Sequence, residues 1–235
     1  MKFRRKTRQQ PGEPAQAEAD AATTADGSDT PAPVDQTSRT PDDGAAPEGP
    51  RAAGPWDASE VSVDVDDPTV VDLGGLLVRG RSGLELRLQV DESSKEVVAV
   101  LLVGAEGAVE LRPFAAPRKS DIWDDVRKQI AAETARRGGT ATEADGPFGK
   151  ELRVVMPVTT PEGQSATQPS RVLGINGPRW LLRATLLGRP AMEPDAQSEI
   201  IDALREVVVV RGAAAMSPGE PLPLVMPSNA APAGQ

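Results

Sequence analysis

The first 60 residues contain almost no large apolar side chains, and this limits where the chain can form a core. After Met1 the only such residues are Phe3, Val34 and Trp56. A segment with so little apolar surface cannot offset the conformational entropy that it would lose on ordering. We therefore predict that the start of the chain is a disordered arm, rich in proline, glycine and acidic residues.

The rest of the chain is long enough for one domain. Roughly 150 residues from Val61 to Arg211 remain, and a chain of that length buries a core without help. The segment that follows holds five prolines, and it either forms a tail or places Leu222–Met226 along an exposed surface. The predicted division is a disordered arm over residues 1–55, one α+β domain over residues 56–211 and a proline-rich tail over residues 212–235.

Charge is unevenly distributed along the chain, whose net charge is −9. Residues 11–60 hold 11 acidic and two basic residues, whereas the first ten residues hold five bases and no acid. The acidic domain argues against specific nucleic-acid binding, because phosphate contacts need clustered lysine and arginine. Two roles remain for this region: a solubilising tail, or weak contact with an anionic surface through its basic tip. The basic tip consists of Lys2, Arg4, Arg5, Lys6 and Arg8.

Hydropathy indicates neither a secretory signal nor a membrane span. The basic tip is followed from Gln9 onward by polar residues, so an apolar signal region is missing. No stretch approaches the ~18 consecutive apolar residues that a spanning helix needs. The expected compartment is the cytoplasm.

Alternating and continuous apolar patterns predict strands in the first half of the domain. Leu84–Val90 and Val109–Phe114 alternate between apolar and polar residues, which is typical of half-buried strands. Val97–Val103 is continuously apolar and suits a strand covered on both faces. The links Asp91–Lys95 and Gly104–Gly107 are short and turn-rich, so these strands are expected to pair in antiparallel order.

Helical spacing then predicts two helices. The first begins with Ser120 as N-cap, and Ile122, Val126 and Ile130 recur at four-residue intervals along a buried stripe. The second opens near Asp195 and turns residues such as Leu204 inward, although the β-branched run after it weakens the prediction of helix there.

Further strands separate the two helices. They are expected over Glu151–Val158, Arg171–Ile175 and Trp180–Leu187, with a tight turn at Asn176-Gly177. The order is therefore strands, helix, strands, helix. It predicts an α+β fold in which two α-helices pack on one face of an antiparallel β-sheet.

A repeated tripeptide places charges on the predicted sheet. Glu-Leu-Arg ends at Arg87, Arg112 and Arg153, and Arg183 takes the equivalent outward position in its own strand. One interpretation is a row of cross-strand ion pairs, each contributing about 0.2–1 kcal/mol. The other is a binding face, because an uncovered sheet carrying the apolar Val97–Val103 strand calls for a cover. The tail, the region around Trp56, a protein partner or a second copy of the chain could each supply it.

Two tryptophans add a second candidate surface. Arg179 and Trp180 follow the tight turn, and Trp123 lies beside the apolar stripe of the first helix. Tryptophan and arginine are favoured anchors at protein interfaces, so a rim of these three residues is one interpretation. The other is that both tryptophans are core residues.

The chain lacks the side chains of most familiar catalytic and metal sites. It contains no histidine, cysteine or tyrosine, which excludes Ser-His-Asp and Cys-His arrangements and zinc sites built on those ligands. Neither a phosphate-binding loop nor a dinucleotide-binding glycine motif occurs. Asp121, Asp124 and Asp125 could hold Mg²⁺, but acidic first turns are ordinary in helices. We therefore predict no catalytic residue, no metal and no cofactor.

Several short segments together resemble one family. In order along the chain they are Gly54–Asp57, Leu84–Asp91, Phe114–Arg118, Gly138–Thr140, Gln168–Arg171 and Gly177–Arg183. This pattern is similar to an actinobacterial family of uncharacterised proteins, the domain of unknown function 3710. The resemblance covers roughly Gly54 to Pro227 and implies an actinobacterial origin. It implies no activity, cofactor or catalytic residue.

These observations favour a non-enzymatic binding or adaptor module that acts through the sheet face or the Arg179–Trp180 rim. One alternative is an enzyme that handles an anionic small molecule with arginines and carboxylates. Another is an envelope- or nucleic-acid-associated protein tethered by its basic N-terminus.

Overall fold

The computed structural model describes residues 49–118, 120–194 and 198–227. These residues all belong to one compact unit, Asp42–Gln235. The basic tip and most of the predicted arm lie outside the described residues.

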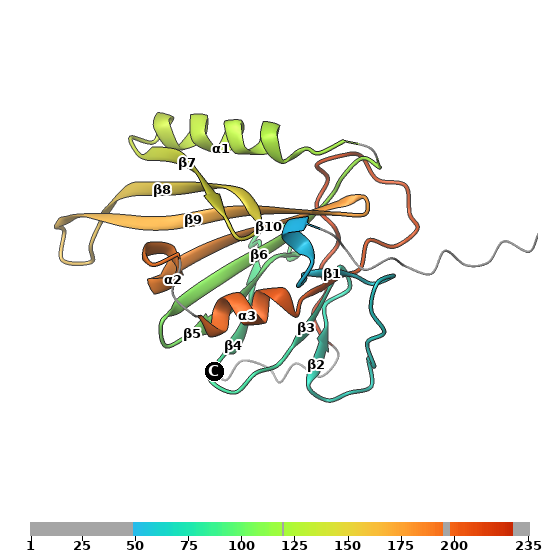
Figure 1. Ribbon diagram of the computed structural model, residues 1–235. Coiled ribbons are helices and arrows are strands. Elements are labelled where there is room, and N and C mark those ends of the chain that lie inside the picture. The colour runs from blue at the N-terminus through green and yellow to red at the C-terminus, as the bar shows by residue number, and fades with distance from the viewer. Residues whose placement is uncertain (1–48, 119, 195–197, 228–235) are drawn as a thin grey trace, which may run out of the picture. The chain divides into compact units, whose positions relative to one another are not determined.

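A seven-stranded antiparallel sheet forms the centre of the described part (Figure 1), with the order β4-β5-β6-β10-β9-β8-β7. Its strands are β4 (Glu85–Val90), β5 (Val97–Gly104), β6 (Gly107–Ala115), β7 (Thr140–Gly146), β8 (Gly149–Thr159), β9 (Ser165–Gly177) and β10 (Trp180–Gly188). The predicted antiparallel sheet is confirmed, and all six strands expected from the sequence are present. β7 was missed, because Thr140–Gly146 contains no alternating run of large apolar residues.

A second, smaller sheet lies beside the first and has the order β1-β11-β3-β2. Its strands are β1 (Trp56–Asp57), β2 (Val70–Asp72), β3 (Leu76–Arg79) and β11 (Val208–Val209). β1 and β11 are parallel, whereas the other pairs are antiparallel. β11 occupies the β-branched run at which the predicted second helix was uncertain, and strands this short give almost no periodic signal in a sequence.

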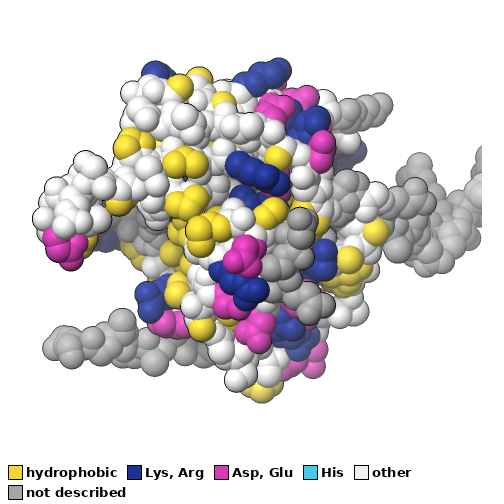
Figure 2. Space-filling view, turned by 60° about the vertical axis from the view of Figure 1, so that its left-hand side comes forward, with side chains coloured by type: hydrophobic (Ala, Val, Ile, Leu, Met, Phe, Trp, Pro, Cys, Tyr) yellow, Lys and Arg dark blue, Asp and Glu magenta, His cyan; other side chains and the backbone are white. Residues whose placement is uncertain are grey.

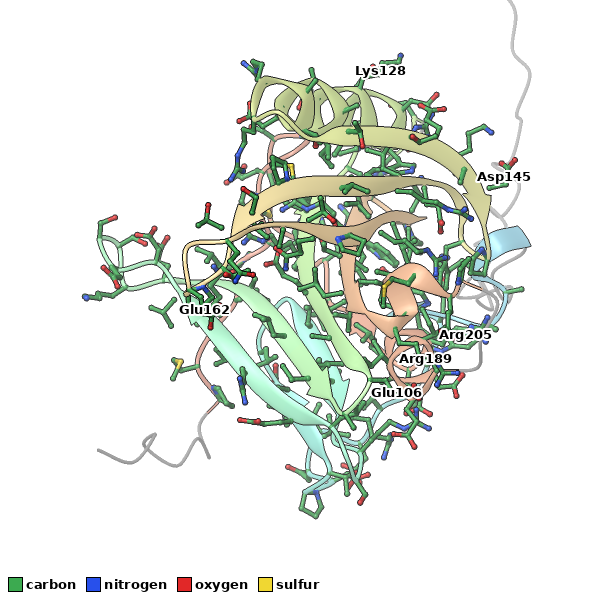
Figure 3. All side chains as sticks on the ribbon, turned by 90° about the vertical axis from the view of Figure 1, so that its left-hand side faces the viewer. Glu106, Lys128, Asp145, Glu162, Arg189 and Arg205 are labelled. Atoms are coloured by element: carbon green, nitrogen blue, oxygen red, sulfur yellow. The ribbon has the colours of Figure 1, made fainter. Side chains whose placement is uncertain are left out.

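The helices are η1 (Gly49–Arg51), α1 (Trp123–Arg136), α2 (Arg189–Met192) and α3 (Glu199–Arg205). The start of α1 differs from the prediction, since it is Asp121 rather than Ser120 whose side chain accepts a hydrogen bond from a helix amide, that of Trp123 at 2.6 Å. α2 is fixed to the β5–β6 turn by Arg189, which pairs with Glu106 (Figure 3). Arg189 also pairs with Glu193, four residues further along the chain.

The two longer helices cover opposite faces of the large sheet, so the prediction that both lie on one face is not confirmed. α1 packs against β7, β8 and β9, whereas α3 packs against β5 and β6 (Figure 1). Under α1 lies a cluster formed by Trp123, Leu152, Val154, Val172 and Leu181. A larger apolar cluster lies on the other face, beneath α3, α2 and the small sheet. Its members include Leu102, Val109, Leu182, Leu186 and Ile200.

This arrangement exposes one face of each half of the sheet. A half-covered antiparallel strand turns its apolar side chains toward its cover and its polar ones toward water. β4, β5 and β6 therefore direct their polar side chains away from α3, and β8 directs its polar side chains away from α1. β9 is buried on both sides over Arg171–Ile175 and β10 over Trp180–Leu182, whereas Arg183 further along β10 is only partly buried.

Part of the predicted tail contributes to the core. Leu222 is 2% exposed and its amide donates a hydrogen bond to the Pro113 carbonyl at 2.9 Å. Leu224 forms isolated bridges with Gly74 and Val97, so it joins the two sheets. Segment Glu220–Leu224 thus lies between the beginning of β5 and the end of β6.

Candidate functional site

The open face of the β4–β5–β6–β10 half carries three of the predicted arginines. Strand register aligns Arg87 with Leu101, aligns Leu101 with Glu110, and places Arg112 directly opposite Arg183. Directly paired residues, and residues two apart on one strand, project from the same side of a sheet. We call this surface the arginine face and define it as Arg87, Leu101, Glu110, Arg112 and Arg183.

Two of the three arginines are paired within the face. Arg87 lies 2.7 Å from Glu85 on its own strand, and Arg112 lies 2.7 Å from Glu110. Arg112 also donates to the Gln89 side-chain oxygen on β4 at 3.0 Å. Ion pairs are therefore present, but each joins residues two apart on one strand, and Arg87 and Arg112 do not form the cross-strand pairs with glutamate that the sequence suggested.

Arg183 differs from the other two arginines. Within the described residues it forms neither an ion pair nor a side-chain hydrogen bond, and its guanidinium carbon lies 5.3 Å from the centre of the Phe114 ring. Burial lowers the pKa of Arg183 from its ordinary value, and the like charge of Arg112 lowers it further. The negative charge of Glu110 raises this pKa, but by less than either of the other two effects lowers it. An arginine stays protonated despite such a shift, so the face contains a partly buried cation without a partner among the described residues.

Arg153 lies on the opposite surface from Arg112, and the expectation of one shared face is wrong for it. Register pairs Arg153 with Arg171, Arg171 with Leu186, and Leu186 with Val109, which points into the cluster beneath α3. Leu152 faces α1 instead, because α1 covers β8 from the other side. The three Glu-Leu-Arg tripeptides share a pattern but not a direction. Arg153 is 51% exposed and its contact with Glu151 is 3.7 Å long.

A hollow of about 620 Å³ adjoins the arginine face where β5 and β6 diverge. Its walls include Arg112 and Phe114 on β6, Val98 on β5, and the C-terminal residues Met216 and Leu224. Sequence analysis did not single out Phe114 as a site residue. Its position two residues after Arg112 in an alternating strand was a usable signal, because it predicts the same face.

Trp123 and Trp180 are core residues in the structure. Trp123 is 3% exposed, lies over Gly174 and donates to the Lys150 carbonyl at 2.6 Å. Trp180 is 0% exposed and donates to the Asp57 carboxylate at 2.7 Å. The rim proposed for these residues therefore offers no tryptophan surface to a partner.

Arg179 and Arg51 hold chain segments in place around Trp180. Arg179 donates to the Gly212 carbonyl at 2.9 Å. Arg51 lies over the Trp180 ring at 5.3 Å and makes a two-pronged pair with Glu60 at 2.5 and 2.6 Å. Through these contacts the Gly177–Trp180 turn holds the segments around Arg51 and Gly212 against the sheet.

The ion pair between Arg171 and Glu151 lies in the interior and was not expected from the sequence. Arg171 donates to both oxygens of Glu151, at 2.9 and 2.7 Å, and to the Pro190 carbonyl at 2.8 Å. Both charged side chains are 1% exposed. A pair this buried, with its donors directed at protein acceptors, fastens α2 to β8 and β9 and leaves no room for a ligand.

The acidic residues around the start of α1 are occupied by local contacts. Asp121 accepts a hydrogen bond from the Trp123 amide, Asp124 lies 2.8 Å from Arg127, and Asp125 lies 3.8 Å from Lys128. In the part of the chain that the structure describes, no group of three or more acidic side chains is placed to hold a metal ion. No described helix is long and apolar enough to cross a membrane.

The surface shows mixed charge in the view of Figure 2, where lysine and arginine side chains lie beside aspartate and glutamate and a band of hydrophobic side chains runs between them. A broad basic patch of the kind that binds nucleic acid is not visible on that face.

Comparison with known proteins identifies a family but not an activity. The family model described as "Protein of unknown function (DUF3710)" matches residues 54–233, which confirms the resemblance seen in the sequence. No curated protein matches the chain. Among solved structures, cyanobacterial PsbP (CyanoP) from Synechocystis sp. PCC 6803 is 10% identical, with a TM-score of 0.33. The match covers 63% of this chain and 98% of that one, and a similarity this low supports no functional argument.

Proposed function

We propose that this chain, which belongs to the family of proteins of unknown function DUF3710, is a non-enzymatic binding module whose arginine face docks an acidic segment of a partner protein. The observation that carries the proposal is the unpartnered guanidinium of Arg183 directly opposite Arg112. A like-charged pair in this position costs stability unless an anion lies between the two. A carboxylate from a partner would supply that anion and accept two-pronged hydrogen bonds.

Charge complementarity favours an acidic protein over a second copy of the chain. In a two-fold dimer the same patch faces itself, so the arginines of one copy would meet both the arginines and the glutamates of the other, whereas an acidic segment brings only anions to Arg183. Nucleic acid is a poorer fit, because Arg87 and Arg112 are already paired with Glu85 and Glu110, and phosphate-backbone binding needs clustered basic residues rather than the one remaining arginine of this face. The cytoplasmic location inferred from the sequence is part of this proposal.

The test is a comparative capture experiment with the full-length chain as bait in nuclease-treated lysate from the source cells. The informative variant is R112Q/R183Q, and R153Q is the matched control because Arg153 is exposed on the opposite surface. We expect at least one acidic protein to bind the native chain and R153Q, and to fall about tenfold or more with the double variant. Purified, that protein should bind the native chain directly.

Three outcomes would overturn the proposal. Capture could be the same with R112Q/R183Q as with the native chain, or be lost equally with R153Q. Sedimentation could also show a dimer that R112Q/R183Q dissociates, which would assign the face to self-association. Circular dichroism of each variant guards against reading an unfolded protein as a loss of binding.

A further inference from the structure

The hollow beside the arginine face has a defined origin in the fold. β5 and β6 pair from Val100 and Leu111 to their connecting turn at Gly104 and Gly107, so the beginning of β5 and the end of β6 diverge. Segment Glu220–Leu224 lies in the gap and makes only isolated bridges there, with Phe114 and with Val97. The space left between these elements is the hollow of about 620 Å³.

The chemistry of the hollow complements that of the arginine face. Most of its described lining is apolar, with Val98, Phe114, Met216 and Leu224 among the residues. Its charged lining residues are Glu96, Glu220 and Arg112, and Arg112 stands in the wall shared with the arginine face. Phe114 belongs to both sites, because its ring lines the hollow and also contacts the Arg183 guanidinium. An apolar group in the hollow would therefore lie next to an anion bound at Arg183.

We propose that the partner segment binds in an extended conformation, with a large apolar side chain in the hollow and a carboxylate two residues away on Arg183. This inference rests on the proposed function and specifies the sequence that the surface recognises. It commits to a peptide with an acidic residue at position i and a leucine, methionine or phenylalanine at i+2.

Geometry supports this spacing. In an extended chain, side chains two residues apart lie on the same side and are about 6.7 Å apart. The Arg183 guanidinium is 5.3 Å from the Phe114 ring centre, so a side chain packed against Phe114 and a carboxylate on Arg183 are separated by a distance of that order. Residues one apart would point to opposite sides and could not fill both positions.

The width of the face favours a peptide over a small amphiphile. Arg87, Arg112 and Arg183 lie on β4, β6 and β10, which are spread across four neighbouring strands. With about 4.8 Å between strands, the arginines extend over roughly 14 Å, a distance that four or five extended residues cross. A small ligand in the hollow would reach only the nearest of them.

The test uses three synthetic pentapeptides of equal charge and isothermal titration calorimetry with the full-length chain. The first peptide, acetyl-Glu-Ser-Leu-Ser-Glu-amide, has the proposed spacing. The second, acetyl-Ser-Glu-Leu-Glu-Ser-amide, contains the same residues with the acids adjacent to leucine, and the third replaces leucine by serine in the first. The protein variants are R183Q and A214W; Ala214 is exposed and lines the hollow, so tryptophan there fills the space without removing an arginine.

We expect the first peptide to bind about tenfold or more tightly than the other two, since burying a leucine side chain is worth a factor of that order. A214W should remove this advantage and leave the binding of the serine peptide unchanged, whereas R183Q should weaken all three. Equal binding of the first two peptides, an A214W variant that binds like the native chain, or no binding by any peptide up to about millimolar concentration overturns the inference. Loss of a captured protein with R112Q/R183Q would still support the proposed function in each of these cases.

Discussion

Glu151 and Arg171 form a two-pronged ion pair in the interior, with each side chain 1% exposed and the nitrogen–oxygen distances at 2.9 and 2.7 Å. The pair joins β8 to β9, and the bond from Arg171 to the Pro190 carbonyl extends the connection to α2. As in any buried ion pair, the free-energy cost of desolvating both charges opposes the gain from their attraction.

Removing one member of this pair should be far more damaging than removing both. R171M leaves the Glu151 carboxylate buried without its partner, and E151Q leaves the guanidinium in the same state, so each should lower the free energy of unfolding by about 3–5 kcal/mol. Urea denaturation measures the loss. The double variant E151M/R171M serves as the control and should lose less than either single variant, and additive losses would contradict this account.

Gly174 and Trp123 are matched in shape, because a Cβ atom at position 174 would overlap the Trp123 indole. G174A should therefore overpack the cluster beneath α1 and cost about 1–3 kcal/mol of stability. The same substitution in a W123L background should cost much less, because leucine leaves space over the strand. Thermal unfolding of the four proteins tests the coupling, and an equal cost in both backgrounds would show that the contact is unimportant.

Arg183 is expected to lower stability in the isolated chain. Replacement by methionine removes the repulsion from Arg112 and the burial of a cation, so R183M should leave the free energy of unfolding unchanged or raise it by up to about 1 kcal/mol. R112M should instead be destabilising, since it deprives Glu110 of its partner. Chemical denaturation compares the two variants. A loss of more than about 1 kcal/mol in R183M would mean that the guanidinium has a partner within the chain, and the argument for a binding face would lose its main support.

Asp91 should make the stability depend on acid pH. Its side chain accepts hydrogen bonds from Ser93 and Ser94 in the β4–β5 turn, and these bonds lower its pKa from 3.8 to about 2. Because the folded pKa lies below the unfolded one, the carboxylate stabilises the fold above pH 3.8 and loses that effect as the pH falls toward 2.

The D91N variant isolates this effect. Relative to D91N, the native chain should have a higher melting temperature at about pH 5, and the difference should shrink below pH 3.8 and be lost as the pH falls through about 2. Carbon-13 NMR of the Asp91 carboxyl group should place the midpoint near 2. A midpoint close to 3.8, or a difference in melting temperature that does not change with pH, would rule out the turn as the cause.

Local patterns were sufficient to locate the strands but not the site. Alternation over Leu84–Val90 and Val109–Phe114 predicted β4 and β6, and it correctly put Arg87 and Arg112 on polar sides. It also indicated that Arg183 is outward, which the register with Arg112 confirms. What it could not indicate is that Arg183 forms no ion pair among the described residues, because that depends on the strands that flank it in space.

By itself the sequence determined which segments alternate, which side of each strand is apolar, and that no histidine or cysteine chemistry is available. Only the tertiary structure decided on which of the two faces of the sheet the polar side chains of each strand lie. Alternation has a period of two and is blind to a reversal of direction, so the Glu-Leu-Arg segments of β6 and β8 look equivalent until their covers are known. With α1 on one face and α3 on the other, Arg112 and Arg153 point apart.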